Sequence, residues 1–141
     1  MSISFSAMTI GDYPSAVELW RHTEGIGLNE SDTEDGVRSF LIRNPGMSAI
    51  ARSSSGDLVG VVLCGHDGRR GYLHHLAVRD SDRNQGIASQ LIEWCFERLA
   101  AGRIQKCNVF LFSDNVAGAA FWLHNGWLPR ADLQLFQKAI D

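Results

Sequence analysis

The segment from Leu76 to Ala88 constrains the fold of this chain more than any other part of the sequence. An apolar strand end runs into a polar turn, and the turn carries Arg83-x-x-Gly86-x-Ala88 directly before a helix. The helix is predicted from apolar residues that recur at a 3.6-residue period and form one buried face. These residues are Ile87, Leu91, Ile92, Cys95, Phe96 and Leu99.

The start of this helix is predicted to bind an anion. Gly86 and Ala88 leave the backbone bare, so the amides of residues 84–89 can point at one spot. Unpaired N–H groups and the helix dipole favour negative charge, and a diphosphate fits such a site. The pattern is neither a GxGxxG dinucleotide motif nor a Walker loop. A strand, a turn with glycine and a helix also occur as plain structure, so the surroundings have to decide.

The turn resembles the acyl-CoA-binding motif of the GCN5-related N-acetyltransferases (GNAT family), Gln/Arg-x-x-Gly-x-Gly/Ala after a strand. Here the motif reads Arg83-Asn84-Gln85-Gly86-Ile87-Ala88, and the strand before it is Tyr72–Val78. Asn84 stands where many members have glycine, a mild departure because asparagine tolerates left-handed backbone angles.

A second segment, from Asn115 to Trp127, resembles the family's Asn-x-x-Ala-x-x-Leu-Tyr-x-x-x-Gly-Phe pattern at the family's spacing. Asn115 is expected to be a polar contact and the N-cap of a short helix. Gly126 is expected to end that helix in a left-handed conformation, with Trp127 opening the next strand. With both motifs in the right order, the chain is identified as a member over nearly its whole length.

Length and composition predict one globular domain, residues 1–141, with 45% apolar residues. The net charge of −3 and the scattered basic residues disfavour nucleic acid or a membrane surface as the main partner. No signal peptide or apolar run of membrane length is recognised, so a cytoplasmic protein is expected. Three cysteines without CxxC spacing fit reduced core thiols, and no metal site is expected.

The hydrophobic pattern predicts the element order βααβββαβαβ(β), an α/β fold with a three-layer sandwich around a central mixed β-sheet. The family resemblance implies the same: the acyl-CoA N-acyltransferase fold, with splayed central strands. The predicted strands are 3–8, 47–52, 58–65, 72–78, 106–112 and about 133–138. The predicted helices are 12–23, one from the Ser31-x-x-Glu34 capping box to Asn44-Pro45, one ending at Gly102, and one after Asn115.

The resemblance implies where acetyl-CoA, the expected co-substrate, binds. The strands that carry Leu76–Val78 and Val109–Phe112 splay apart, and the pantetheine arm pairs in the gap like an added strand. The N–H of Leu76 or Ala77 polarises the thioester carbonyl. The full set of implied cofactor contacts is Leu76, Ala77, Val78, Arg83, Asn84, Gln85, Gly86, Ile87, Ala88, Ser89, Asn115 and Trp122.

The reaction needs a proton acceptor, because an alkylammonium with a pKa near ~10 must become neutral before it attacks. Family members often have Glu where this chain has Tyr72. The strand instead resembles the His-Leu-His-x-Leu-Ala-Val strand of arylalkylamine N-acetyltransferases, whose histidines convey the proton through water. That match makes His74 the first candidate and His75 the second. Period-2 alternation predicts the two on opposite faces, so one of them is expected to be structural.

Trp122 departs from the family, which usually has a tyrosine there to protonate the leaving thiolate. An indole N–H donates a hydrogen bond but is no acid at neutral pH. The thiolate then leaves unassisted or takes a proton from water, and Trp122 either walls the thioester pocket or is ordinary packing.

The sequence indicates the residues that bind the acceptor amine less specifically than it indicates the cofactor site. Arg69 and Arg70 precede the catalytic strand and are candidates to pair with a substrate carboxylate, although a solvated turn is the more usual explanation of such a loop. Glu30 is a candidate to hold an ammonium group.

The resemblance implies an acetyl-CoA-dependent N-acetyltransferase that acts on a small-molecule, peptide or protein amine by direct attack in a ternary complex. A homodimer is possible in such a protein. The alternative is a non-catalytic acyl-CoA-binding sensor or interaction domain, which Trp122 and the missing glutamate leave open.

Overall fold

A computed structural model describes residues 2–140 of the chain. It divides into two compact units, one up to Phe110 and one from Leu111 on, and each is described by itself. Between residues 2 and 140, no helix is long and apolar enough to cross a membrane.

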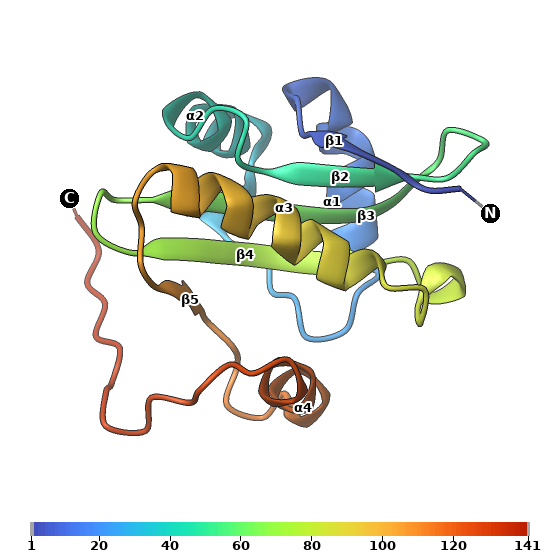
Figure 1. The fold of residues 1–141 in the computed structure, drawn as a ribbon. Coiled ribbons are helices and arrows are strands. Elements are labelled where there is room, and N and C mark those ends of the chain that lie inside the picture. Colours follow the sequence, from blue (N-terminus) through green and yellow to red (C-terminus); the bar gives the residue numbers. More distant parts are fainter. Residues whose placement is uncertain (1, 141) are drawn as a thin grey trace. The chain divides into compact units, whose positions relative to one another are not determined.

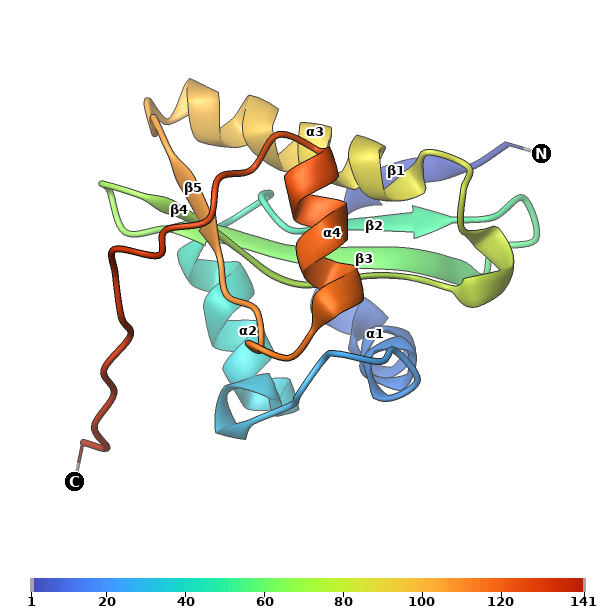
Figure 2. The ribbon, with the colours of Figure 1, turned by 90° about the horizontal axis from the view of Figure 1, so that it is seen from below.

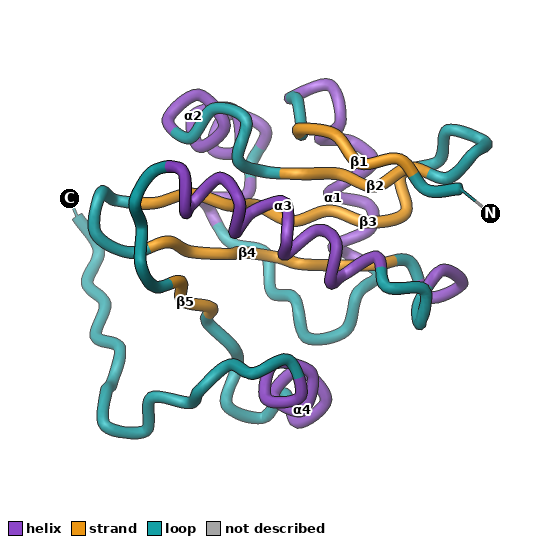
Figure 3. The backbone as a smooth tube through the Cα atoms, viewed as in Figure 1, coloured by secondary structure: helices purple, strands orange, loops and turns teal. Residues whose placement is uncertain are grey.

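The first unit is built on a mixed five-stranded sheet with the strand order β1-β2-β3-β4-β5 (Figures 1 and 3). The first three neighbouring pairs are antiparallel, and β4 and β5 are parallel. The strands are β1 Ser4–Ala7, β2 Ala49–Arg52, β3 Leu58–His66, β4 Gly71–Val78 and β5 Cys107–Val109. Two hairpins join β2 to β3 and β3 to β4, as the sequence predicts.

Helices cover both faces of this sheet, which confirms the predicted three-layer α/β sandwich. Helices α1 (Tyr13–Arg21) and α2 (Glu34–Arg43) lie on one face, and α3 (Ile87–Ala101) lies on the other (Figure 2). The core on the first face joins residues of α1 and α2 to apolar residues of the strands: Ala16, Val17, Trp20, Val37, Ile50, Val61, Leu63 and Ala77. This burial of apolar surface holds the two helices against the sheet.

The start of α2 differs from the predicted Ser31–Glu34 capping box. Thr33 Oγ1 accepts the hydrogen bond from Gly36 N at 3.1 Å, so the helix begins after Thr33. A separate 3₁₀ turn, Glu30–Asp32, precedes it, and there Asp32 Oδ2 accepts from Asn29 N at 2.9 Å. The prediction was wrong because two successive starts, each with its own cap, share one short polar stretch.

The second unit contains α4 (Val116–His124) with the predicted ends. Asn115 Oδ1 accepts from Gly118 N at 2.9 Å, which confirms the N-cap. Gly126 has φ +87°, and Trp127 N donates to Trp122 O at 3.0 Å, which confirms the left-handed stop.

The predicted strands at Trp127 and around 133–138 are wrong, and β5 ends at Val109 rather than near 112. A strand exists only where its backbone bonds to a neighbour, and within residues 127–140 no such pairing is present. Local alternation of apolar residues such as Leu133 and Leu135 cannot supply that neighbour.

A substitution at Gly65 tests the packing of α2 on β3. A Cβ there would lie 2.6 Å from Asn44 Nδ2 and 2.8 Å from Phe40 Cζ, and Asn44 is the acceptor for His66 N at 3.1 Å. We expect Gly65→Ala to lower the free energy of unfolding in urea by about 1–3 kcal/mol. Gly11→Ala is the control, because its Cβ would meet only Thr9 Oγ1 at 3.5 Å. Equal stability of the two variants would contradict this packing.

Candidate functional site

The turn before α3 has an unusual backbone. Asn84 has φ +64° and Gly86 has φ +78°, so two residues of the Arg83–Ala88 motif are left-handed. Glycine and asparagine adopt this region most easily, which is why both residue types suit the turn. Asn84 therefore adopts the left-handed conformation that asparagine was expected to tolerate at this position.

The N-terminus of α3 has no side-chain cap. Gly86 is its N-cap residue, and the first turn carries no acidic side chain. In α2, by contrast, Thr33 caps the helix and two acidic residues follow it. A Cβ on Gly86 would meet nothing within 4 Å, so the space beside this turn is open. The first amides of α3 are thus left for a negatively charged ligand, helped by the helix dipole.

An ion pair holds the turn between β4 and α3. Arg79 Nε donates to Asp82 Oδ2 at 2.6 Å, and Asp82 is only 3% exposed. The hydrogen bond to Asp82 raises the pKa of Arg79. Arg79 N also donates to Val59 O at 2.8 Å, which ties the turn to β3. Arg83 is half exposed and donates from Nε to Val78 O at 3.1 Å.

The strands β4 and β5 separate after a short parallel contact. Their pairing runs from Gly71 opposite Cys107 to Leu73 opposite Val109, whereas β3 pairs with β4 as far as Val78. Within residues 2–110, no strand pairs with residues 74–78 on the β5 side. This open edge includes Leu76–Val78 and is the place where an extended ligand can add as a strand.

One extra residue lies in β4 beside this edge. Leu63 pairs with His74 and Val61 pairs with Ala77, so two residues of β4 stand opposite one of β3. His75 has φ +54°, a conformation that residues with a Cβ rarely adopt. The irregularity is a β-bulge at His75–Leu76, a feature that re-aims side chains and backbone.

The bulge overturns the predicted alternation of the two histidines. The His74 ring meets Phe40 of α2 edge-on at 5.8 Å, and the His75 ring meets Trp20 of α1 at 5.2 Å. Since α1 and α2 cover the same face of the sheet, both histidines point to that face. In a regular strand, only every second side chain lies on the same face of the sheet. The extra residue of the bulge lets two successive side chains, those of His74 and His75, lie on one face.

His75 is held at both its side chain and its backbone. Its Nε2 lies 3.0 Å from Asp32 Oδ2, and its carbonyl accepts from Trp20 Nε1 at 2.8 Å. Asp32 is 7% exposed, and its own carbonyl accepts from Tyr13 Oη at 2.6 Å. Sequence reasoning did not identify Asp32 as a site residue, because a contact 43 residues away along the chain leaves no local pattern.

His74 is partly buried and lies against aromatic rings. Its ring stacks on Tyr72 at 6.2 Å and contacts Phe40, and Tyr72 stacks in turn on Phe110 at 6.0 Å. Burial lowers the pKa of His74; His75 lowers it further, and the charge of Asp32 opposes them. The imidazole is therefore neutral at pH 7 and able to take up a proton.

The residues predicted to bind the amine substrate lie in two different places. Glu30 is exposed in the same 3₁₀ turn as Asp32, so it lies close in sequence to the residue that contacts His75. Arg69 and Arg70 lie in the β3–β4 loop, where their amides donate to Asp67 Oδ1 at 2.8 and 2.9 Å. At ~3.3 Å per strand residue, Arg70 is roughly 20 Å from Leu76.

The remaining predicted cofactor residues, Asn115 and Trp122, belong to the second unit. The Trp122 ring contacts Phe121 at 5.1 Å and Trp127 at 4.7 Å. From residue 2 to residue 140, no group of three or more His, Cys, Asp or Glu side chains converges as a metal site would require.

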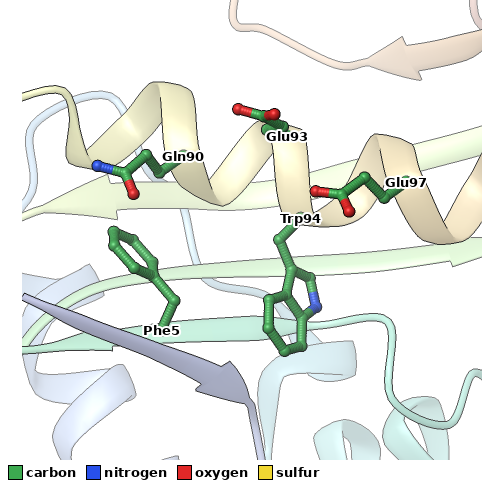
Figure 4. A pocket seen from close by; sticks show the side chains of 5 residues that line it. All are labelled: Phe5, Gln90, Glu93, Trp94 and Glu97. Atoms are coloured by element: carbon green, nitrogen blue, oxygen red, sulfur yellow. The ribbon is translucent and has the colours of Figure 1, made fainter.

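A hollow of about 270 Å³ lies between α3 and β1 (Figure 4). It is lined by Phe5, Gln90, Glu93, Trp94 and Glu97. None of these residues belongs to β4, to the turn before α3 or to the Asp32–His75 contact. The hollow is therefore separate from the candidate site.

Comparisons with known proteins identify the family and the fold. The model of the acetyltransferase (GNAT) family matches residues 13–127. An acetyltransferase of Yersinia enterocolitica is 31% identical over 106 residues, which cover 75% of this chain and 74% of that protein.

Solved structures share the fold at low identity. The PaiA N-acetyltransferase from Thermoplasma acidophilum, in complex with coenzyme A, has a TM-score of 0.76 at 18% identity and covers 89% of each chain. AAC(6')-Iy, in complex with the bisubstrate analogue CoA-S-monomethyl-acetylneamine, also has a TM-score of 0.76, at 15% identity. The similarity to AAC(6')-Iy covers 99% of this chain and 100% of that one.

Proposed function

Because this chain belongs to the acetyltransferase (GNAT) family, we propose that it transfers the acetyl group of acetyl-CoA to a primary amine. The acceptor is a small molecule or a peptide or protein, and the amine attacks the thioester directly in a ternary complex. Residues 1–141 act as one acetyltransferase domain in this proposal.

One observation carries the choice of cofactor: the open edge of β4 leads directly into the uncapped N-terminus of α3. An open strand edge suits a chain of amides, and a bare helix N-terminus suits a diphosphate. Coenzyme A carries both, joined in that order. The shared fold with the coenzyme A complex of PaiA supports the same choice.

The proposed contacts follow from this placement. The backbone of Leu76–Val78 binds pantetheine, and residues Arg83–Ser89 bind the diphosphate. The N–H of Leu76 or Ala77 polarises the thioester carbonyl, a role that backbone donors fill well in a fixed geometry. Asn115 and Trp122 stay predicted cofactor contacts, carried by the family resemblance.

The proposed proton acceptor is His74. The amine nitrogen forms a bond to the acetyl carbon, the carbon–sulfur bond breaks, and the amine proton passes to the imidazole directly or through water. The coenzyme A thiolate leaves with the electron pair, which a thiol pKa near ~8.5 permits without an acid. A neutral imidazole, such as the lowered pKa of His74 provides, suits this step.

The acceptor is proposed to bind beside the Glu30–Asp32 turn. Glu30 offers an exposed carboxylate next to the residue that contacts His75, and a carboxylate attracts an ammonium group. AAC(6')-Iy, whose complex joins coenzyme A to acetylneamine, supports an amine acceptor in this fold. Arg69 and Arg70 stay candidates for a substrate carboxylate.

A panel of acceptors tests the function. We expect thiol release from acetyl-CoA with at least one member of a set of alkyl and aryl amines, aminoglycosides, amino acids and peptide N-termini. Reactions without an acceptor are the control for hydrolysis. Tight acetyl-CoA binding without turnover on any acceptor would favour the sensor alternative, for which Trp122 in place of tyrosine is the motivating residue.

The anion site is tested by a charge reversal at Gly86. At acetyl-CoA about 100 times its Kd, the wild type should gain about 2.7 kcal/mol of stability, seen as a rise in Tm. Gly86→Glu should abolish this rise, because a carboxylate then lies where the diphosphate binds. Gly56→Glu is the matched control: Gly56 also has a positive φ, +90°, with nothing within 4 Å, but lies in the β2–β3 hairpin. A normal rise in the Gly86 variant would exclude this diphosphate site.

The proton path is tested by His74→Ala. The lowered pKa of His74 keeps the imidazole unprotonated at neutral pH, so protonation of His74 should reduce wild-type kcat/KM only below neutral pH, in addition to the loss caused by protonation of the amine. The variant should lose ~10²-fold or more in kcat at pH 7 and regain part of it at high pH, where more amine is neutral. The Phe40 and Tyr72 contacts make His74→Phe a second variant that keeps the packing. An unchanged pH–rate profile in both variants would make His74 structural.

A further inference from the structure

We propose that Asp32 is a positioning residue for acetyl transfer, which fixes the β4 bulge through His75. The bulge sets the direction of the Leu76 and Ala77 backbone beside the open edge of β4. This inference rests on the proposed role of those amides at the thioester. It goes beyond that role because it assigns the positioning of these amides to a residue in a different segment, between α1 and α2.

The contact between Asp32 and His75 is largely buried and is supported by further hydrogen bonds. The two side chains are 7% and 17% exposed, and Asp32 Oδ2 lies 3.0 Å from His75 Nε2. The same oxygen accepts from Asn29 N at 2.9 Å, and the carbonyl of Asp32 accepts from Tyr13 Oη at 2.6 Å. A buried carboxylate with these partners has little freedom to move.

The backbone of His75 is fixed from α1. Trp20 is fully buried, and its Nε1 donates to His75 O at 2.8 Å. His75 keeps φ +54° although it has a Cβ. A non-glycine residue in this region is strained, and such a conformation persists only where the surroundings hold it. Asp32 and Trp20 provide that hold, at the side chain and at the carbonyl.

The bulge also determines the backbone orientation of the next two residues, Leu76 and Ala77. Because His75 and Leu76 stand opposite one residue of β3, the orientation of the peptide after His75 depends on the bulge. If the His75 side chain is released, the bulge can relax and the Leu76 amide turns away. Misplacement by about 1 Å is enough to cost ~10²-fold in rate.

Ionisable side chains lie near both histidines. Asp32 from the 3₁₀ turn contacts His75, Tyr13 from α1 binds the carbonyl of Asp32, and Tyr72 stacks on His74. The charge of Asp32 raises the pKa of His74, while His75 lowers it. Loss of Asp32 and loss of His75 should therefore shift the titration of His74 in opposite directions.

The chain offers a matched control in Asp12. Like Asp32, Asp12 is the third residue of a 3₁₀ turn, is 8% exposed, and accepts from the N-cap amide at 2.9 Å. Its other partner is Arg52 rather than His75. Asp12→Asn and Asp32→Asn therefore remove equivalent turn carboxylates, and only the second touches the bulge.

The experiment compares both variants with the wild-type enzyme. Asp32→Asn should lower kcat about 10- to 100-fold, with a smaller change in KM for acetyl-CoA, because the diphosphate contacts at α3 remain and only the pantetheine contact at Leu76 and Ala77 is disturbed. Asp12→Asn should lose stability but keep kcat. In NMR spectra without acetyl-CoA, the amide signals of Leu76 and Ala77 should shift in Asp32→Asn and not in Asp12→Asn. The His74 titration should move to lower pH in Asp32→Asn and to higher pH in His75→Gln.

Unchanged Leu76 and Ala77 amide signals in Asp32→Asn would overturn the proposal, whatever the activity. So would a wild-type kcat in that variant. If Asp32→Asn does not fold, His75→Gln replaces it, and it should perturb the same amides from the other side of the contact. Lack of acetyl transfer by the wild type contradicts the proposed function instead, and the NMR comparison then still decides the role of Asp32.

Discussion

The extra residue in β4 is the constraint on which the candidate site depends. It places His74 and His75 on one face of the sheet and reorients the backbone just before the open edge at Leu76–Val78. Without this extra residue, one histidine would face α3, and Trp20 and Asp32 would not both contact His75. The bulge in turn depends on α1 and the 3₁₀ turn before α2, because Trp20 and Asp32 stabilise a backbone conformation that is uncommon for residues other than glycine.

A repeated device supports this arrangement. Each of the three 3₁₀ turns of the described chain ends in a buried aspartate: Asp12, Asp32 and Asp82, which are 8%, 7% and 3% exposed. Each carboxylate pairs with a basic side chain: Arg52, His75 and Arg79. A buried carboxylate needs such a partner, since an unpaired charge away from water is costly. The three pairs stabilise three separate turns, and only the pair with His75 lies at the bulge.

The local signals were sufficient for most of the framework. The 3.6-residue period of α3, the N-cap at Asn115 and the left-handed stop at Gly126 depend on neighbouring residues, and the structure has all three. Only Phe96 of the apolar residues predicted on the buried face of α3 is wrong, because it is 44% exposed. The family motif at Arg83–Ala88 likewise lies in one short segment and needs only a turn and a helix start. The capping box before α2 was placed wrongly because Asn29, Ser31 and Thr33 are all good caps, and packing selects among them. The strand expected near Leu133 failed because alternation does not provide a neighbouring strand.

The sequence by itself determined the family, the α/β sandwich, and the segment that offers backbone amides to a diphosphate, because these follow from periodicity and from a contiguous motif. Only the tertiary structure decided that β4 contains a bulge, that both histidines share a face, and that Asp32 holds one of them. Strand register is set by pairing between segments, and a one-residue shift leaves no trace in the strand's own sequence. The contact between Asp32 and His75 joins residues 43 positions apart, so it exists only once α1, the turn before α2 and β4 have packed together.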